Sequence, residues 1–356
     1  MSEIRNRIAT FCERYRLDIP ILLAPMAGAC PASLSIAVAN AGGLGACGAL
    51  LMQPTEIAAW VAEFRSQSGR VFQLNLWIPD PEPVRDAEHE SRIRAFLANW
   101  GPAPLAESAD ARPPDFSAQC EAVWAAKPSI VSSVMGLYPK DFVTRLKASG
   151  IAWFANVSTV AEARAAEAAG ADVIVAQGME AGGHRGCFDA RLGERQQVGL
   201  FALLPAVVDA VDLPVVATGG IADPRGVAAA FTLGASAVQI GTGFLRCPEA
   251  KIHTAWAQAL GQTPPEGTML TRAFSGRAGR SIATDYVRAA ASSTAPGPAP
   301  YPVQRGLTAA MRQAAQQSGD VQRMQAWAGQ SSAMARAEPA ADVLNYLWHG
   351  AQQLLR

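Results

Sequence analysis

The sequence lacks the features that mark several large classes of proteins. Its 356 residues contain no dense basic block, and 30 Lys and Arg residues balance 30 Asp and Glu residues. That balance argues against nucleic acid or an anionic membrane surface as the main partner. The six cysteines are far apart and form no CxxC pair, so we expect neither a disulfide framework nor a metal site.

Long apolar segments are missing as well. No uninterrupted apolar run approaches the roughly 20 residues that cross a bilayer. The first residues, MSEIRNRIATFCERY, carry charges throughout instead of the apolar core of a signal peptide. Together with cysteines that form no paired motif, these absences predict a cytoplasmic protein with no membrane partner. They give no indication of the oligomeric state.

What the sequence does contain is a repeated junction of helix and strand. Half of the residues are hydrophobic. Alanine-rich helical stretches lead, often through a glycine, into short apolar runs within 148–158, 168–178, 211–220 and 233–243. A helix that ends at a glycine and leads into a buried strand is half of a βαβ unit. Strands that are apolar on both faces indicate a parallel sheet covered by helices.

Counting outward from these junctions gives eight candidate strands, at 20–25, 43–50, 71–78, 129–135, 151–157, 172–177, 214–218 and 236–241. Helical patterns separate them, for example at 54–67, 139–150 and 159–170. Eight parallel strands that alternate with helices predict an α/β fold of the TIM (β/α)8 barrel type, which needs about 250 residues. An open doubly wound sheet is the alternative.

Two stretches interrupt the alternation. The segment 101–118 is rich in Pro and Ala and forms a long excursion between the third and fourth strands. After the eighth strand the pattern stops, which predicts a barrel over 1–254, a mainly helical cap over 255–335 and a C-terminal segment over 336–356. Within the cap we expect helices at 307–317 and 321–329, and we expect the final helix, 339–355, to pack back on the barrel.

Glycines follow the last two predicted strands, where a barrel forms its active site. Gly219 and Gly220 come after the seventh strand, and Gly241, Thr242 and Gly243 come after the eighth. Backbone N–H groups in such turns, next to a helix N-terminus, form a phosphate site. The alternative is that these glycines only turn the chain.

Polar and polarizable side chains at other strand ends suggest what the phosphate belongs to. Pro25 and Met26 end the first strand, Asn75 lies in the third, and Gln177 ends the sixth. A methionine can contact an aromatic ring, and buried amides need hydrogen-bond partners, although purely structural roles for Met26 and Asn75 are also open. Flavin mononucleotide (FMN) fits this set, whereas the GxGxxG fingerprint of dinucleotide binding does not follow the first strand.

One of the four histidines lies where packing is poorest. His184 stands in the stretch VAQGMEAGGHRGCFD, in the loop after the sixth strand. The glycines around it offer few side chains to bury an imidazole, and the flanking Glu180 and Arg185 can set its protonation, which is near balance at neutral pH. We therefore expect His184 to be functional. The other three lie in helical patterns and are expected to be structural: His89, His253 and His349.

These residues together resemble the nitronate monooxygenase family, formerly called 2-nitropropane dioxygenases, over nearly the whole chain. The most specific string is AQGMEAGGHRG (176–186). Flavin-dependent enoyl-acyl-carrier-protein reductases share its EAGGH part, but the continuation through Arg185 and Gly186 and the cap segment TRAFSGR favour the monooxygenases. The looser matches are APMAG (24–28), QLN (73–75), ATGGI (217–221), QIGTGF (239–244) and RAFSGR (272–277).

The resemblance implies an FMN barrel whose catalytic residue is His184. The flavin ring and ribityl chain would contact Ala24, Pro25, Met26, Asn75, Gln177 and Gly182. The chain and phosphate would be held by Gly219, Gly220, Gln239, Gly241 and Thr242. One departure is VSSVMG at 131–136, where many relatives carry an aromatic segment. Because Ser133 and Val134 stand there, we expect a reshaped pocket floor and an altered substrate size.

The implied activity is FMN-dependent oxidation of an alkyl nitronate, such as propionate 3-nitronate, by molecular oxygen. No metal is expected to take part. One alternative is an NAD(P)H-dependent FMN reductase that acts on an enoyl thioester or a quinone. Another is a barrel that binds FMN for sensing or storage without turnover.

Overall fold

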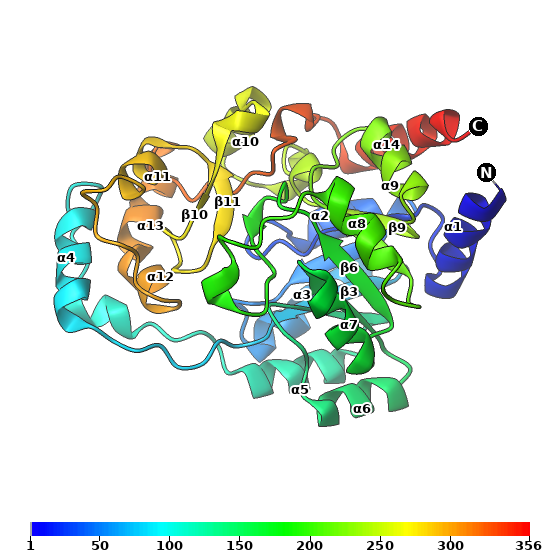
Figure 1. Ribbon diagram of the computed structural model, residues 1–356, viewed down its shortest axis with the longest axis horizontal. Helices are drawn as coiled ribbons and strands as arrows, with labels where there is room; N and C mark the ends of the chain where they lie inside the picture. Colours follow the sequence, from blue (N-terminus) through cyan, green and yellow to red (C-terminus); the bar gives the residue numbers. More distant parts are fainter. Residues whose placement is uncertain (1) are drawn as a thin grey trace.

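The computed structural model describes residues 2–356. Eight parallel strands form one sheet in the order β1-β9-β8-β6-β5-β4-β3-β2, and a bridge between Leu22 and Leu44 brings its two edges together (Figure 1). The strands are β1 (Ile21–Leu23), β2 (Gly45–Gly48), β3 (Phe72–Trp77), β4 (Ile130–Val134), β5 (Ala152–Val157), β6 (Val173–Gln177), β8 (Val215–Thr218) and β9 (Ala237–Ile240). This arrangement confirms the barrel and all eight predicted strands, and it excludes the open doubly wound sheet.

Helices alternate with the strands, and their starts follow from local sequence. The helix predicted at 54–67 is α3 (Pro54–Gln67), which begins at a proline and is held by a Gln53–Glu56 capping box. Thr159 caps α7 by accepting a hydrogen bond from the N–H of Glu162. The other helices around the barrel are α1 (Ser2–Tyr15), α2 (Ala32–Asn40), α5 (Phe116–Ala126), α6 (Lys140–Ala148), α7 (Val160–Ala168), α8 (Leu200–Val208), α9 (Pro224–Thr232) and α14 (Ala340–Leu354).

The C-terminal helix packs on the barrel wall. α14 contacts α9 and α2, and the rings of Trp348 and Phe231 meet edge to face with centroids 6.1 Å apart. Its buried face is apolar, and Leu344 and Leu347 join the main hydrophobic core. No helix in residues 2–356 combines the length and apolarity that crossing a bilayer requires.

The cap contains a small sheet in addition to its helices. Its helices are α10 (Thr254–Gln262), α11 (Asp285–Ala290), α12 (Val303–Leu307) and α13 (Ala309–Ser318). Between them a hairpin of β10 (Thr268–Thr271) and β11 (Gly279–Ile282) pairs with β7 (Gly183–His184), the short strand in the loop after β6. This small sheet joins the cap to the loop that carries the histidine, and no sequence pattern indicated it.

Two expected helices in the cap differ in the structure. The stretch 307–317 is divided at Thr308 into the end of α12 and most of α13. The stretch 321–329 is not a helix, because its backbone bonds to β11 instead. The N–H of Ile282 and the hydroxyl of Ser281 both donate to the carbonyl of Ala326, and tertiary pairing has overridden helix propensity.

The excursion at 101–118 belongs to the cap side of the molecule. It contains a short 3-10 helix, η1 (Ala106–Asp110), that contacts α12. The preceding helix, α4 (Ala87–Leu97), lies beside α12 and α13 in Figure 1. Ile93 and Leu97 share a second hydrophobic core with Phe274, Tyr286 and Leu307. The cap therefore rests on its own apolar core next to the barrel core.

Candidate functional site

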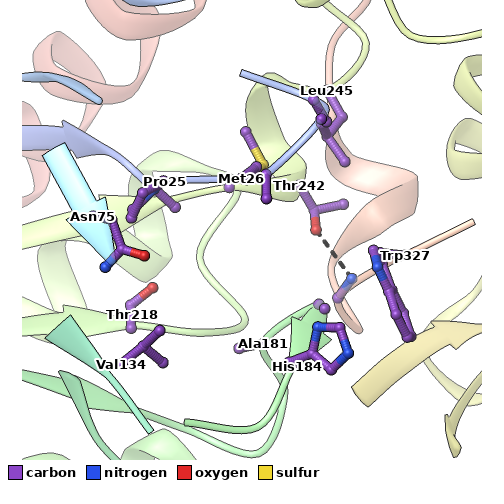
Figure 2. A pocket seen from close by; sticks show the side chains of 18 of the residues that line it. Pro25, Met26, Asn75, Val134, Ala181, His184, Thr218, Thr242, Leu245 and Trp327 are labelled. Atoms are coloured by element: carbon purple, nitrogen blue, oxygen red, sulfur yellow. Dashed lines mark hydrogen bonds between the residues drawn. The ribbon is translucent and has the colours of Figure 1, made fainter. Parts of the chain in front are cut away.

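A cavity of about 560 Å³ lies at the carboxyl ends of the barrel strands, under the cap. Figure 2 shows that the side chains around it come from strands far apart in the sequence. Every residue to which the resemblance assigns a site role lines this one cavity: Ala24, Pro25, Met26, Asn75, Gln177, Gly182, His184, Gly219, Gly220, Gln239, Gly241 and Thr242. The fold thus brings all of the predicted residues together.

The charge of the lining is one-sided. None of the described residues that line the cavity is Asp, Glu or Lys, but Arg305 of α12 and Arg312 of α13 are among them. Arg305 has no carboxylate within 4 Å and its guanidinium donates no hydrogen bond in the described structure. Burial lowers the pKa of both guanidinium groups, and Arg305 lowers that of Arg312 further, to about 10. Such a lining favours an anionic ligand.

The glycine turns after β8 and β9 leave backbone groups open to the cavity. Gly219 and Gly220 have φ angles of 115° and 68°, which side-chain-bearing residues rarely adopt. Neither N–H makes a main-chain hydrogen bond within residues 2–356. These two donors therefore remain for a ligand.

The last segment of the cap fixes both turns from the other side. Ser331 donates to the carbonyl of Gly220 at 2.5 Å. The N–H of Gly329 donates to Oγ1 of Thr242 at 3.0 Å (Figure 2). A Cβ on Gly182 would lie 2.5 Å from the Gly329 nitrogen, so this close approach requires glycine there.

The two predicted amides differ in their partners. Asn75 donates to Oγ of Ser132 at 3.0 Å, and Figure 2 shows its amide beside the cavity. Gln177 instead holds the loop that follows its own strand. Its Nε2 donates to the carbonyl of His184 at 3.1 Å, and its Oε1 accepts from the N–H of Gly186 at 2.8 Å. Gln177 thus positions the histidine backbone, a role that the sequence did not indicate.

The imidazole of His184 is half-buried, contrary to the expectation from its glycine-rich neighbours. Its packing partners come from other elements. The ring stands edge-on to Trp77 at the end of β3 and to Trp327 in the last segment of the cap, with centroids 4.7 and 4.8 Å away. Its Nε2 lies 2.7 Å from Oγ of Ser275, while Nδ1 makes no hydrogen bond in the part of the chain that the structure describes. The long-range fold therefore provides what the local sequence lacks.

The protonation of His184 is set by its surroundings rather than by its sequence neighbours. Burial, with smaller contributions from the positive charges of Arg277 and Arg305, lowers the pKa of His184 from 6.5 to about 3. The expectation that Glu180 and Arg185 set it is wrong. The Glu180 carboxylate accepts from the N–H of Leu200, and Arg185 donates to the carbonyl of Gly178 at 2.7 Å.

The cap loop that contacts His184 is locked by a buried ion pair. Ser275 is fully buried and lies in the segment RAFSGR. Two residues on, Arg277 donates to both carboxylate oxygens of Asp80 at 2.8 Å each. The sequence identified RAFSGR as a family motif, but it gave no sign of the partners in space, His184 and Asp80.

Several other residues show what the sequence missed or left open. Asn156 of β5 lines the cavity and has a buried Nδ2 without a partner in the described structure. At the altered floor, Ser133 does not line the cavity and accepts a hydrogen bond from Trp153, whereas Val134 lines it together with Ser132 and Met135. His253 caps α10 through the N–H of Ala255, and His89 and His349 lie on α4 and α14. These placements support structural roles for the three.

Comparison with known proteins gives one consistent family. The nitronate monooxygenase family model matches residues 12–350. The chain is 38% identical to a nitronate monooxygenase of Paraburkholderia phytofirmans, over 93% of this chain and 92% of that one. It is 36% identical to a nitronate monooxygenase of Pseudomonas aeruginosa, over 95% and 97% of the two chains.

Solved structures agree with the sequence comparison. The structure of nitroalkane oxidase from Streptomyces ansochromogenes superposes with a TM-score of 0.87 at 34% identity. The match covers 97% of this chain and 100% of that one. FabK from Thermotoga maritima is more distant, with a TM-score of 0.75 at 26% identity over 97% and 96% of the two chains. The chain belongs to the nitronate monooxygenase family, a family of oxidoreductases.

Proposed function

We propose that this enzyme is an FMN-dependent nitronate monooxygenase that oxidises alkyl nitronates, such as propionate 3-nitronate, with molecular oxygen. One observation carries the proposal: a neutral histidine stands in a cavity that has two arginines and no acidic residue among its described lining. A nitronate is an anion that has already lost its carbon-bound proton. The cavity therefore suits it in charge and needs no strong base.

The residues present fit FMN. The cavity volume is within the range of about 300–1,000 Å³ that is usual for such ligands. The free N–H groups of Gly219 and Gly220 suit a phosphate. Asn75 and Gln177 each retain hydrogen-bonding capacity for the polar edge of the ring, since an amide has two donors and two lone pairs. Bound FMN supplies the redox chemistry, taking electrons from the substrate and passing them to oxygen.

The protein holds that cofactor, in this proposal, with two sets of residues. Ala24, Pro25 and Met26 at the end of β1 and Gly182 in the β6 loop would contact the ring and ribityl chain together with the two amides. Gln239, Gly241 and Thr242 would hold the remaining chain and the phosphate together with the glycines after β8.

His184 binds and orients the substrate anion. The Ser275 hydroxyl can donate its proton to either of two acceptors. His184 Nε2 is 2.7 Å away, and the Arg277 carbonyl is 3.2 Å away. We assign the hydroxyl proton to His184, which leaves Nδ1–H free to donate to a nitronate oxygen. A donor aimed at the reacting anion stabilises the developing charge distribution. With a pKa near 3, the same ring is a poor base for deprotonating a neutral nitroalkane.

Arg305 suits a substrate with a second negative charge. Its guanidinium has no partner among the described residues and lies near enough to His184 to lower the pKa of that ring. A carboxylate such as that of propionate 3-nitronate would pair with it by charge-assisted hydrogen bonds.

The substitution His184→Asn tests the proposal. We expect the purified variant to keep its bound FMN, with an unchanged flavin absorbance spectrum, while turnover of nitronate falls by about 100-fold or more, the usual cost of losing a donor at the reacting charge. His253→Asn, which changes the cap of α10 at a residue that does not line the cavity, is the matched control. Undiminished turnover in His184→Asn would show that the histidine has no part in the reaction.

A further inference from the structure

A second cavity, of about 480 Å³, adjoins the first beyond the carboxyl end of β3. It lies between the loop after β3, the excursion around η1 and the start of α12. The excursion thus lines a cavity that the proposed reaction does not use. Two residues line both cavities, Leu50 after β2 and Trp77 at the end of β3.

The second cavity is lined by rings and by five charged residues. Two of the five, Glu82 and Arg112, make no ion pair among the described residues, and the other three are paired. Asp80 is paired with Arg277, and Arg85 is paired with Glu90 and Asp110. Between these pairs the lining consists largely of rings, including Pro79, Pro81, Pro113, Pro114, Phe116 and Pro302. These rings give an aliphatic chain an apolar surface on which to lie.

Trp77 stands between the two cavities with an aromatic partner on each side. Its ring meets His184 at 4.7 Å and Tyr301 at 5.6 Å between centroids. His184 lines the first cavity but not the second, and Tyr301 lines the second but not the first. Leu50, which is only 9% exposed, also stands between the two cavities, so that Trp77 and Leu50 together separate them.

We propose that Trp77 sets the limit on substrate chain length, and that the second cavity is a pocket for a linear aliphatic chain once this indole is removed. The inference rests on the proposed function, because it places the nitronate group at His184 and asks where its carbon chain can extend. On the His184 side the chain meets the Trp77 ring. A short nitronate fits within the first cavity, whereas a chain of eight or so carbons needs the space beyond.

Trp77→Ala tests the partition. We expect kcat/KM for octyl nitronate, divided by that for propyl nitronate, to rise at least tenfold over the ratio of the unaltered enzyme. Burying one more methylene tightens binding about fourfold. Two additional buried methylenes are therefore enough for the expected tenfold change. Using the ratio corrects for any general loss of activity caused by removing a ring that packs on His184. Trp77→Leu provides a milder second variant if Trp77→Ala does not fold.

A second substitution identifies which space the chain enters. Ala111 lines the second cavity only, and Ala111→Trp fills it. Added to Trp77→Ala, this change should return the octyl-to-propyl ratio to its original value. Ala106→Trp is the matched control, because Ala106 is exposed on the same excursion and lines neither cavity. A ratio that does not rise, or a rise that Ala111→Trp leaves intact, would overturn the proposal.

Equilibrium binding keeps this test separate from the reaction. Octanoate and propanoate, which cannot be oxidised in this way, are titrated into the flavin-loaded proteins while the flavin absorbance is recorded. Trp77→Ala should bind octanoate at least tenfold more tightly relative to propanoate, and Ala111→Trp should cancel the gain. If no protein oxidises propyl nitronate, the proposed function fails, yet the octanoate result still supports or overturns the role of Trp77.

Discussion

The barrel and the cap build the two sides of the cavity in different ways. On the barrel side the groups that face the cavity after β8 and β9 belong largely to the backbone, at Gly219, Gly220 and Gly241. On the cap side they are large side chains, such as Arg305 and Trp327. A backbone surface suits a group that is common to many enzymes, and a side-chain surface can vary with the substrate. We therefore assign cofactor binding to the barrel side and substrate selection to the cap side, together with Trp77 at the end of β3.

His184 connects the two sides. Its loop starts on barrel strand β6, where Gln177 fixes it, and its short strand β7 pairs with β11 of the cap. The ring itself contacts Ser275 from the cap loop. A change in the cap loop around Ser275 can thus alter the position of the histidine while Gly329 and Ser331 still hold the glycine turns. The following experiments use this separation.

The largest effect is expected on the barrel side, from Gly219→Val. The φ of 115° disfavours any side chain, and an added Cβ would lie 3.2 Å from the carbonyl oxygen of Gly178. We expect the variant to be purified without FMN and therefore colourless and inactive, as measured by absorbance. Gly69→Val, at an exposed glycine where a Cβ meets no atom within 4 Å, is the control and should stay yellow. A Gly219→Val protein with full FMN content would contradict the assignment of this turn.

On the cap side, Arg305→Met should change selectivity and leave FMN bound. Removing a charge-assisted hydrogen bond of about 1.5–3 kcal/mol lowers kcat/KM for propionate 3-nitronate by roughly 10- to 100-fold. Propyl nitronate, which lacks the carboxylate, should lose much less. The measurement is the ratio of the two kcat/KM values, with Arg288→Met at an exposed position of α11 as the control. Equal losses for both substrates would place the carboxylate elsewhere.

The smallest effect concerns the pH dependence of stability. In the folded protein the pKa of His184 is about 3, below its ordinary value of 6.5. As the pH falls below 6.5, His184 takes up a proton in the unfolded chain but not in the folded protein. The free energy of unfolding therefore decreases. Between pH 7 and pH 5 the loss is at most about 2 kcal/mol.

Denaturant unfolding of the unaltered protein and of His184→Asn, both saturated with FMN, measures this contribution. We expect the variant to lose less stability than the unaltered protein over the same pH interval. Identical losses would mean that the imidazole is not packed by the tryptophans and the cap as described.

The sequence predicted the barrel side well because its signals are local. An apolar β-branched run preceded by a glycine is visible within ten residues, and helix α3 was predicted to the residue because Pro54 and Glu56 mark its start. The glycine turns after β8 and β9 were found for the same reason. Each lies directly after a predicted strand, where a barrel forms its ligand site.

The cap side was predicted poorly because its structure depends on contacts between distant residues. Ser275 is 91 residues from His184 in the chain. The segment around Trp327 is extended because Trp327 pairs with Ser281. The strands of the small sheet have two to four residues, too few to show a period. The pKa of His184 was likewise inaccessible, since Arg277 and Arg305 act on it through space.

Anaerobic mixing of the FMN-loaded enzyme with a nitronate tests the central claim most directly. We expect propionate 3-nitronate to bleach the flavin absorbance band at about 450 nm within the time of one turnover. We expect air to restore the band. NAD(P)H should leave the oxidised spectrum unchanged. Bleaching by NAD(P)H together with no response to nitronate would contradict the account and identify a reductase, and a spectrum inert to both donors would identify a flavin-binding protein without turnover.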